Sequence, residues 1–134
     1  MGKILHLKNR RDFIRAAAGI RMVVSSVILQ AAPNLSGVNM PFRVGFTTTK
    51  KIGNAVVRTR VRRRLRAAVR EIFPKFAKDN VDYVLIGRST TVCCAYETLK
   101  ADLKWALKKT NLMIENGVYK SVPVEERSKK ENHD

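Results

Sequence analysis

The sequence has 134 residues, with 27 lysines and arginines against 11 aspartates and glutamates, so its formal net charge is +16. Because 45% of the residues are hydrophobic, the chain is not a disordered basic tail, and its length predicts a single folded domain. The charge excludes cationic partners and favours a polyanion, first nucleic acid and second an anionic membrane surface.

The first half of the chain is predicted to contain a short helix and two strands. Asp12–Ala18 favours a helix that ends at Gly19. Val23–Ala32 is rich in β-branched and apolar residues, which predicts one strand. Phe42–Thr49 alternates apolar and polar residues, which predicts a second strand antiparallel to the first.

The next segment, Ala55–Phe73, has the clearest helical pattern in the chain. Asn54 is the expected N-cap, and Pro74 is expected to end the helix. The apolar residues recur at spacings of three and four, which places them on one face: Val57, Val61, Leu65, Ala68, Val69 and Ile72.

The rest of the chain predicts one strand and one helix. Asp82–Arg88 is mostly apolar, as expected for the centre of a sheet, and residues 89–94 link it to a last helix at Tyr96–Thr110. Residues 116–134 are polar and predict a loose tail, so the domain spans residues 1–115. The order α-β-β-α-β-α predicts an α+β fold: a two-layer sandwich of helices on a mixed sheet.

The charge is concentrated in the first half of the chain and in the helix predicted there. Residues 1–70 hold 16 basic residues and one acid, Asp12, whereas residues 71–134 hold 11 basic and 10 acidic residues. Like charges at helical spacing repel by about 0.2–0.5 kcal/mol per pair, which destabilises the isolated helix. The pattern therefore favours a helix that binds an external polyanion. Its seven basic residues are Arg58, Arg60, Arg62, Arg63, Arg64, Arg66 and Arg70.

The choice of arginine over lysine in this helix indicates nucleic acid. A guanidinium binds phosphate oxygens bidentately and stacks on bases, which an ammonium cannot do. Backbone amides near Gly53 and Asn54, at the helix N-terminus, add a further anion site. A structured RNA would be bound through shape and phosphates, because side chains cannot read its deep, narrow major groove. The alternative is an ordinary solvated amphipathic face.

The sequence gives little support for a signal peptide, a membrane span, a disulfide, a metal site or a catalytic site. The N-terminus lacks the apolar segment of a signal peptide, and the apolar run Met22–Ala32 is too short to span a membrane, so we expect a cytoplasmic protein with no membrane partner. Cys93 and Cys94 are adjacent, which disfavours a disulfide. The two histidines lie near opposite ends, so we expect no metal site and no catalytic residue.

The segment from Lys50 to Arg66, KKIGNAVVRTRVRRRLR, resembles the signature of the bacterial ribonuclease P protein subunit. In that family a Lys-Lys-hydrophobic-Gly-Asn-Ala-Val stretch leads into an Arg-Asn-Arg helix. Similar segments around Phe13, Arg43 and Asp82 extend the resemblance to about residues 5–110. The chain departs from the family pattern at His6, Ala17, Gln30 and Thr59.

The resemblance implies a fold with a left-handed β-α-β crossover, whereas the right-handed form is the default. It also implies an RNA subunit that cleaves precursor tRNA and holds most of the Mg²⁺ cofactor. The protein would bind that RNA and the 5′ leader of the substrate, and so assist endonucleolytic removal of the leader. The resemblance leaves the oligomeric state open.

Site residues follow from the same resemblance, position by position. The leader is expected in a cleft between the first helix and the sheet, at Phe13, Lys8 and Arg43. A base could stack on Phe13, although core packing is the alternative for this ring, as it is for Ile28 and Phe46. The positions expected to bind the RNA subunit are Lys50, Lys51, Asn54, Arg58, Arg60, Arg62, Arg63 and Arg66.

Three other functions remain as alternatives. A ribosomal-type RNA-binding protein would share the composition and the fold class, but it would not depend on precursor tRNA. A DNA-binding module would need a second helix packed for groove entry, whereas strands flank the arginine helix. A stand-alone nuclease would need clustered carboxylates, and Asp82 is expected to be only a strand-start residue.

Overall fold

The structure is a computed structural model, and it describes residues 4–34 and 39–119. Residues 120–134, most of the predicted tail, lie outside the described residues, so the tail and the domain boundary at residue 115 stay predictions. Within the described ranges, no helix combines the length and hydropathy needed to cross a membrane.

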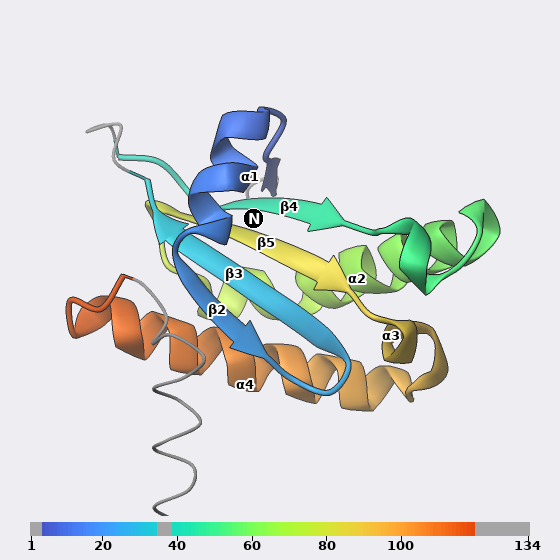
Figure 1. The fold of residues 1–134 in the computed structure, drawn as a ribbon. Coiled ribbons are helices and arrows are strands. Elements are labelled where there is room, and N and C mark those ends of the chain that lie inside the picture. Colours follow the sequence, from blue (N-terminus) through green and yellow to red (C-terminus); the bar gives the residue numbers. More distant parts are fainter. Residues whose placement is uncertain (1–3, 35–38, 120–134) are drawn as a thin grey trace, which may run out of the picture.

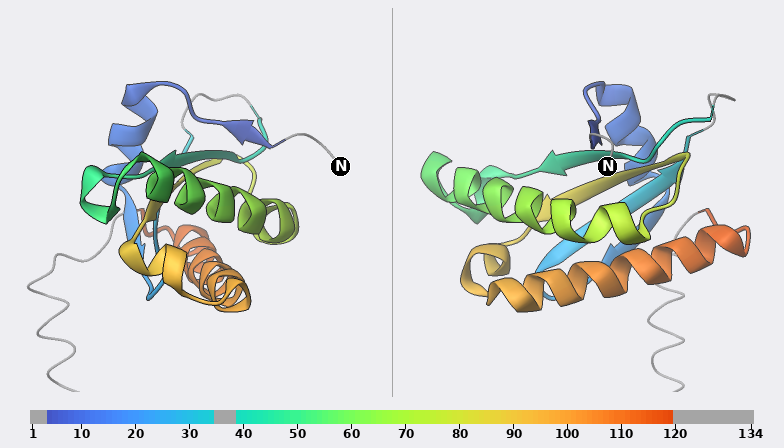
Figure 2. Two further views of the ribbon diagram at one scale, coloured as in Figure 1. Left: turned by 90° about the vertical axis from the view of Figure 1, so that its right-hand side faces the viewer. Right: turned by 180° about the vertical axis from the view of Figure 1, so that it is seen from behind.

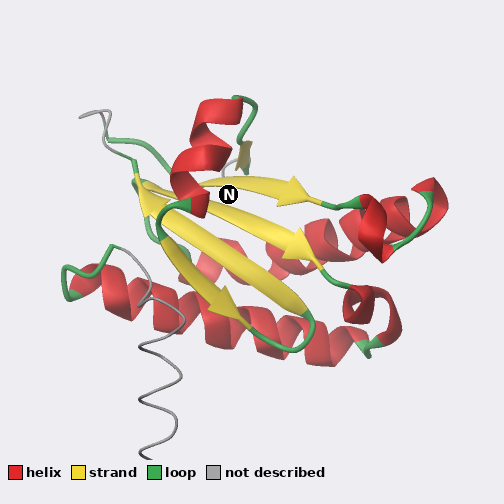
Figure 3. Ribbon diagram, in the orientation of Figure 1, coloured by secondary structure: helices red, strands yellow, loops and turns green. Residues whose placement is uncertain are grey.

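Five strands form one mixed sheet in the order β1-β4-β5-β3-β2 (Figures 1 and 3). The strand β4 is parallel to its neighbours β1 and β5, whereas β3 is antiparallel to β5 and β2. The predicted central position of the apolar strand β5 is confirmed. The strands are β1 (Leu5–His6), β2 (Ile20–Val23), β3 (Val27–Pro33), β4 (Arg43–Thr47) and β5 (Val81–Gly87).

The two long helices lie together on one face of the sheet, and the first helix lies on the other face (Figure 2). The α+β fold with a mixed sheet is confirmed, and α1 adds a partial third layer to the expected sandwich. The helices are α1 (Arg10–Ala17), α2 (Ala55–Phe76), α3 (Ser89–Cys93) and α4 (Tyr96–Glu115), and a 3-10 turn η1 (Lys50–Ile52) precedes α2.

The main core lies between the sheet and the layer of α2 and α4. Alternate residues of β5 point to opposite faces, so Tyr83 and Leu85 enter this core, whereas Val84 joins a smaller cluster beneath α1. The ring of Phe73, from α2, packs edge-on against Tyr83 at 5.2 Å between centroids. The helix α2 buries one face in this core, so the rest of its surface is available for other contacts.

The helix α2 connects the parallel neighbours β4 and β5. In Figure 1 both strands point to the right, β4 lies above β5, and α2 lies behind them, so the crossover is left-handed, as the resemblance implied. The helix lies close to the end of β5, where a Cβ at Gly87 would come within 2.5 Å of Val61 Cγ1. Only glycine allows this approach between α2 and the sheet.

Some elements differ from the sequence prediction. The segment Val23–Ala32 is not one strand, because β2 and β3 form a hairpin with a turn at residues 24–26. The strand β4 does run antiparallel to β3, but β5 is inserted between them. Neither β1 nor α3 is predicted, since both are too short for a periodic pattern.

Both long helices extend beyond their predicted ends. Pro74 lies in the last turn of α2 and does not end the helix. Few backbone hydrogen bonds of the helix lie beyond this position, and the buried side chain of Phe73 holds the last turn against the core. Helix α4 continues past Thr110 because Asn111 is buried and donates to the Phe76 carbonyl oxygen at 2.6 Å. This contact joins the ends of the two helices.

Candidate nucleic-acid interface

The start of α2 is fixed by the side chain of Asn54. Its Oδ1 atom accepts a hydrogen bond from the Val57 backbone amide at 3.0 Å, which confirms the predicted N-cap. The turn η1 places Lys50 and Lys51, both exposed, immediately before this helix terminus. Two ammonium groups and the free amides of the first turn therefore gather at one end of α2.

The arginines of α2 occupy the part of its circumference that faces away from the core. Val61, Leu65 and Phe73 are fully buried, whereas Arg60, Arg63 and others around the helix are exposed. Among the described residues, no arginine of α2 makes an ion pair with a carboxylate. The helix therefore presents uncompensated positive charge, which a polyanion would neutralise.

Arg64 differs from the other arginines of α2 because its guanidinium is bound by backbone carbonyl oxygens. Its guanidinium donates to the backbone carbonyl oxygens of Thr91 at 3.0 Å, Val92 at 2.6 Å and Cys94 at 2.7 Å. These bonds fasten α2 to the segment between α3 and α4. Arg64 therefore has a structural role, and the resemblance did not place it among the RNA-binding positions.

The arginines expected to bind the RNA subunit divide between two sides of α2. Arg62 and Arg66 border a depression of about 260 Å³, whereas Arg60 and Arg63 border another of about 350 Å³ on the outer side of the helix. In the outer depression Val56 is 68% exposed. Thr59, which replaces the family's asparagine, also lines this depression, and its hydroxyl accepts from Arg62 at 3.4 Å.

The inner depression lies where α2, β4 and the N-terminal segment meet. Arg66 lies 5.7 Å from the centroid of the Phe46 ring, and the His6 ring lies 6.1 Å from it. Arg62 donates to Thr48 Oγ1 at 2.8 Å, which holds its guanidinium at the rim. Cationic groups beside aromatic rings can bind both phosphates and unstacked bases. The residues lining this depression are His6, Leu7, Phe13, Val44, Gly45, Phe46, Arg62 and Arg66.

Phe13 reaches this depression from α1. Its ring lies directly over Gly45, where a Cβ would come within 2.6 Å of two ring atoms. The ring is half-buried, packs against the cluster of Leu7 and Val84, and also lines the depression. Both predicted roles for Phe13 are therefore compatible with its position, and its contact with a leader stays a prediction.

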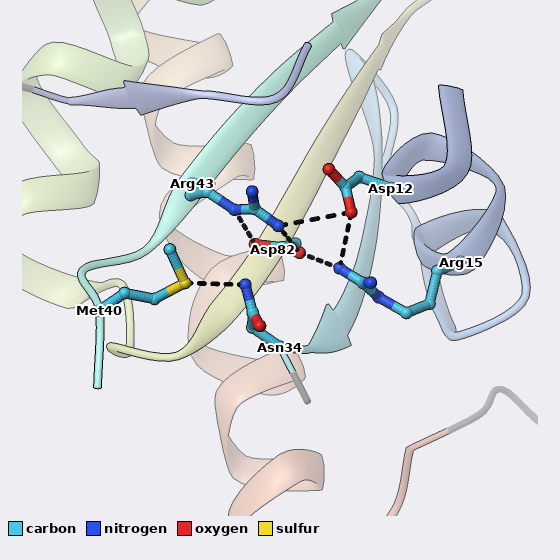
Figure 4. Close-up of polar contacts among 6 residues, drawn as sticks. All are labelled: Asp12, Arg15, Asn34, Met40, Arg43 and Asp82. Atoms are coloured by element: carbon cyan, nitrogen blue, oxygen red, sulfur yellow. Dashed lines mark hydrogen bonds and ion pairs between the residues drawn. The ribbon is translucent and has the colours of Figure 1, made fainter. Parts of the chain in front are cut away.

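Arg43 belongs to a cluster of four charged residues, two buried aspartates and two partly exposed arginines, that joins α1, β4 and β5 (Figure 4). It donates to Asp82 from Nε at 2.8 Å and from Nη2 at 2.7 Å, and Asp82 is only 1% exposed. Arg15 also pairs with Asp82, and Asp12 lies 3.3 Å from Arg15 and 3.5 Å from Arg43. The hydrogen bond with Asp82 raises the pKa of the Arg43 guanidinium.

This cluster corrects the expectation that Asp82 is only a strand-start residue. Sequence reasoning missed it because its members are far apart in the chain, although Asp12 as the only acid before Glu71 was a signal. The guanidinium of Arg43 is held by carboxylates, and Lys8 is exposed just before α1. The predicted leader contacts of both residues remain untested.

The carboxylates of this surface do not form a metal site. Mg²⁺ requires several oxygen ligands, and in residues 4–34 and 39–119 no group of three or more histidine, cysteine, aspartate or glutamate residues could hold a metal ion. Asp12 and Asp82 are instead paired with arginines. The residues described here therefore do not fit a resident Mg²⁺.

A helix with uncompensated arginines beside an aromatic-lined depression, on a mixed sheet, is typical of an RNA-binding protein. A model of the family described as Ribonuclease P matches residues 1–111. The chain belongs to the ribonuclease P protein family, and its function is therefore RNA binding within a ribonuclease of tRNA processing.

Curated relatives agree with this assignment. The ribonuclease P protein component of Paramagnetospirillum magneticum is 48% identical over 111 residues, covering 80% of this chain and 83% of that protein. That of Ruegeria pomeroyi is 44% identical over 104 residues, covering 77% and 83%.

The solved structures support the fold. The RNase P protein of Staphylococcus aureus matches with a TM-score of 0.66 at 23% identity, covering 81% of this chain and 96% of that one. The RNase P protein from Thermotoga maritima matches with a TM-score of 0.66 at 23% identity, covering 78% and 96%.

Proposed function

We propose that this chain is the protein subunit of a ribonuclease P ribonucleoprotein in the cytoplasm, and that it binds the catalytic RNA subunit and the 5′ leader of precursor tRNA. The observation that carries this proposal is the set of α2 arginines without carboxylate partners among the described residues. Such a helix gains stability when phosphates neutralise it. Membership of the family supports RNA as the source of those phosphates.

The two sides of α2 would bind different RNAs. The outer side, with Arg60 and Arg63, and the N-terminal lysines Lys50 and Lys51 would bind phosphates of the RNA subunit. The inner depression lies between Arg66 and Phe13, so an unpaired leader nucleotide could stack there while its phosphate meets a guanidinium. The RNA subunit would hold the Mg²⁺ and cleave the substrate, and this chain would position both RNAs.

The first test is reconstitution with a bacterial ribonuclease P RNA, assayed for 5′ maturation of precursor tRNA across a Mg²⁺ titration. We expect the protein alone to leave the substrate intact and to lower the Mg²⁺ concentration that the RNA needs, because its cations replace part of the metal's charge screening. Cleavage by the protein without RNA would overturn the proposal. Tight binding to ribosomal RNA with no effect on maturation would favour the ribosomal alternative.

The second test measures how affinity for the RNA subunit falls with salt. The Arg60→Ala, Arg63→Ala double variant should flatten the logarithmic salt dependence by about 1.5, since each lost phosphate contact removes about 0.7–0.9. The matched control is Lys78→Ala, Lys100→Ala, which removes two charges that already pair with carboxylates. Equal slopes for the two variants would show that the outer side of α2 faces away from RNA.

A further inference from the structure

A second basic surface lies at the opposite end of α2 from the arginines just described. It consists of Phe76 at the end of α2 and of Lys104, Trp105, Lys108 and Lys109 on α4, and we call it the α4 patch. The Nζ atoms of Lys104 and Lys108 lie 5.0 and 5.1 Å from the centroid of the same Phe76 ring. Lys109 lies 5.7 Å from the ring centroid of Trp105, a side chain left 51% exposed.

The acids of α4 are all engaged away from this patch. Glu97 pairs with Lys100 at 3.1 Å, Glu115 pairs with Lys78 at 3.0 Å, and Asp102 accepts from the Ser26 hydroxyl at 2.7 Å. In contrast, the three lysines of the patch have no carboxylate partner within the described part of the chain. The charges of α4 are thus segregated, although its sequence looks mixed.

This arrangement concentrates like charge on one part of α4. Lys104 and Lys108 lie one helical turn apart and share one ring, so their charges repel each other. An ordinary solvated face would place an acid between them. Exposed lysines around two aromatic rings instead offer charge for phosphates and a flat surface for an unstacked base. The patch therefore has the same chemistry as the inner depression beside α2.

The position of the patch indicates which RNA it would meet. From Arg60 to Phe76, α2 rises by about 24 Å, so the patch lies well outside the first surface. It lies on the face of the sheet covered by α2 and α4, whereas α1 and Phe13 approach from the other face (Figure 2). An RNA bound along the outer side of α2 can continue onto α4 on the same face of the sheet, whereas α1 lies on the opposite face.

We propose that the α4 patch is a second docking surface for the RNA subunit, which binds backbone phosphates through Lys104 and Lys108 and an unpaired base through Trp105. This proposal rests on the proposed function, since it requires that α2 binds the same RNA. The protein would then contact the RNA subunit at two places separated by the length of α2.

The test compares a Lys104→Gln, Lys108→Gln variant with a Lys78→Gln, Lys100→Gln control of equal net charge. For both, affinity for the ribonuclease P RNA is measured across a salt series, and the RNA backbone is footprinted with and without protein. We expect the patch variant to lower the logarithmic salt slope by about 1.5 and to remove one footprint while the others remain. The control should keep the wild-type slope and every footprint. A thermal melt of each variant checks that it is folded.

Other outcomes separate the two proposals. If the wild-type protein does not bind the RNA subunit, the proposed function itself fails. If the wild type binds, the Arg60→Ala, Arg63→Ala variant binds weakly and the patch variant matches its control, only the α4 proposal fails. An effect of the patch variant that appears solely on precursor tRNA affinity, or on sedimentation with phosphatidylserine vesicles, would also overturn it, because the surface would then serve another partner.

Discussion

Tyr83 shows how one buried polar group couples the core to pH. Its hydroxyl donates to Asn111 Oδ1 at 2.6 Å and accepts from the Lys78 amide at 3.0 Å. Burial is the main cause that raises the pKa of this phenol above its ordinary value near 10. The folded protein therefore keeps the proton at a pH where the unfolded chain releases it, so stability is complete below about pH 10 and falls as pH rises further.

A Tyr83→Phe variant should lose this alkaline sensitivity. Near neutral pH it should be less stable by about 1–3 kcal/mol, because a buried amide oxygen and a backbone amide lose their partner. Above about pH 10 the wild type should lose about 1.4 kcal/mol per pH unit more than the variant, so the difference should shrink. Urea unfolding from about pH 8 to pH 11 measures both effects. Parallel curves would contradict the prediction, and Tyr119→Phe, at a half-exposed ring, is the control.

Asp82 plays a different part from Tyr83 although the two are adjacent in β5. Tyr83 points into the main core, whereas Asp82 points to the α1 face and pairs with Arg15 and Arg43. A carboxylate this deeply buried costs little only when its partners are present. The cluster therefore fixes α1, and with it the Phe13 ring, against the sheet.

At the scale of elements, two neighbouring arginines of α2 have different surroundings. Arg64 makes three hydrogen bonds to backbone carbonyl oxygens, whereas Arg63 is exposed and lines the outer depression. Because Arg63 and Arg64 have the same side chain, replacing each in turn distinguishes an effect on folding stability from an effect on RNA binding.

The variant Arg64→Met should lower the free energy of unfolding by about 2–4 kcal/mol, since partly buried carbonyl oxygens lose a charged donor. Arg63→Met should change stability by less than about 0.5 kcal/mol and should weaken binding to the RNA subunit instead. Chemical denaturation and RNA binding, measured on the same preparations, give both values. A stable Arg64 variant with weakened RNA binding would mean that Arg64 faces the RNA.

The sequence predicts these elements to different degrees. Helix α2, its N-cap Asn54 and the central strand β5 follow from local patterns, and the structure confirms them. The hairpin of β2 and β3 was missed because a continuous apolar run hides a turn of only three residues. The strand β1 depends on pairing with β4, a contact between distant segments.

The candidate site shows the same contrast. The arginines and their exposure follow from helical periodicity, because the apolar stripe determines which positions face solvent. Three other features depend on tertiary contacts. Arg64 binds carbonyl oxygens, Asp82 pairs with two guanidiniums, and the lysines of α4 are segregated from its acids. Apart from the isolated acid Asp12, which hints at the Asp82 cluster, local sequence patterns do not predict them.

At the scale of the whole molecule, a net charge of +16 on 134 residues opposes the compact state. The described ion pairs involve Arg15, Arg43, Lys78 and Lys100, which leaves the α2 arginines and the α4 patch unpaired. The free protein is thus less stable than the same fold with anions bound.

Polyphosphate should therefore raise the melting temperature more than sodium chloride of equal ionic strength. At about 100 times its dissociation constant the ligand adds about 2.7 kcal/mol, which corresponds to roughly 8–14 °C for a domain of this size. The Arg60→Ala, Arg63→Ala variant should melt at or above the wild type without anion and gain less from it. Identical shifts in both salts would argue that self-repulsion is unimportant.

The close contact between Gly87 of β5 and Val61 of α2 limits how far the arginine helix can move relative to the sheet. A helix packed this closely on the sheet, with Val61, Leu65 and Phe73 fully buried, resists sliding or tilting, so the backbone positions of its arginines stay at fixed intervals. Folding already orders the backbone of α2, so binding costs only the conformational entropy of its side chains. If RNA binds along α2 as proposed, the helix would act as a rigid template, and the RNA would have to bring its phosphates to it.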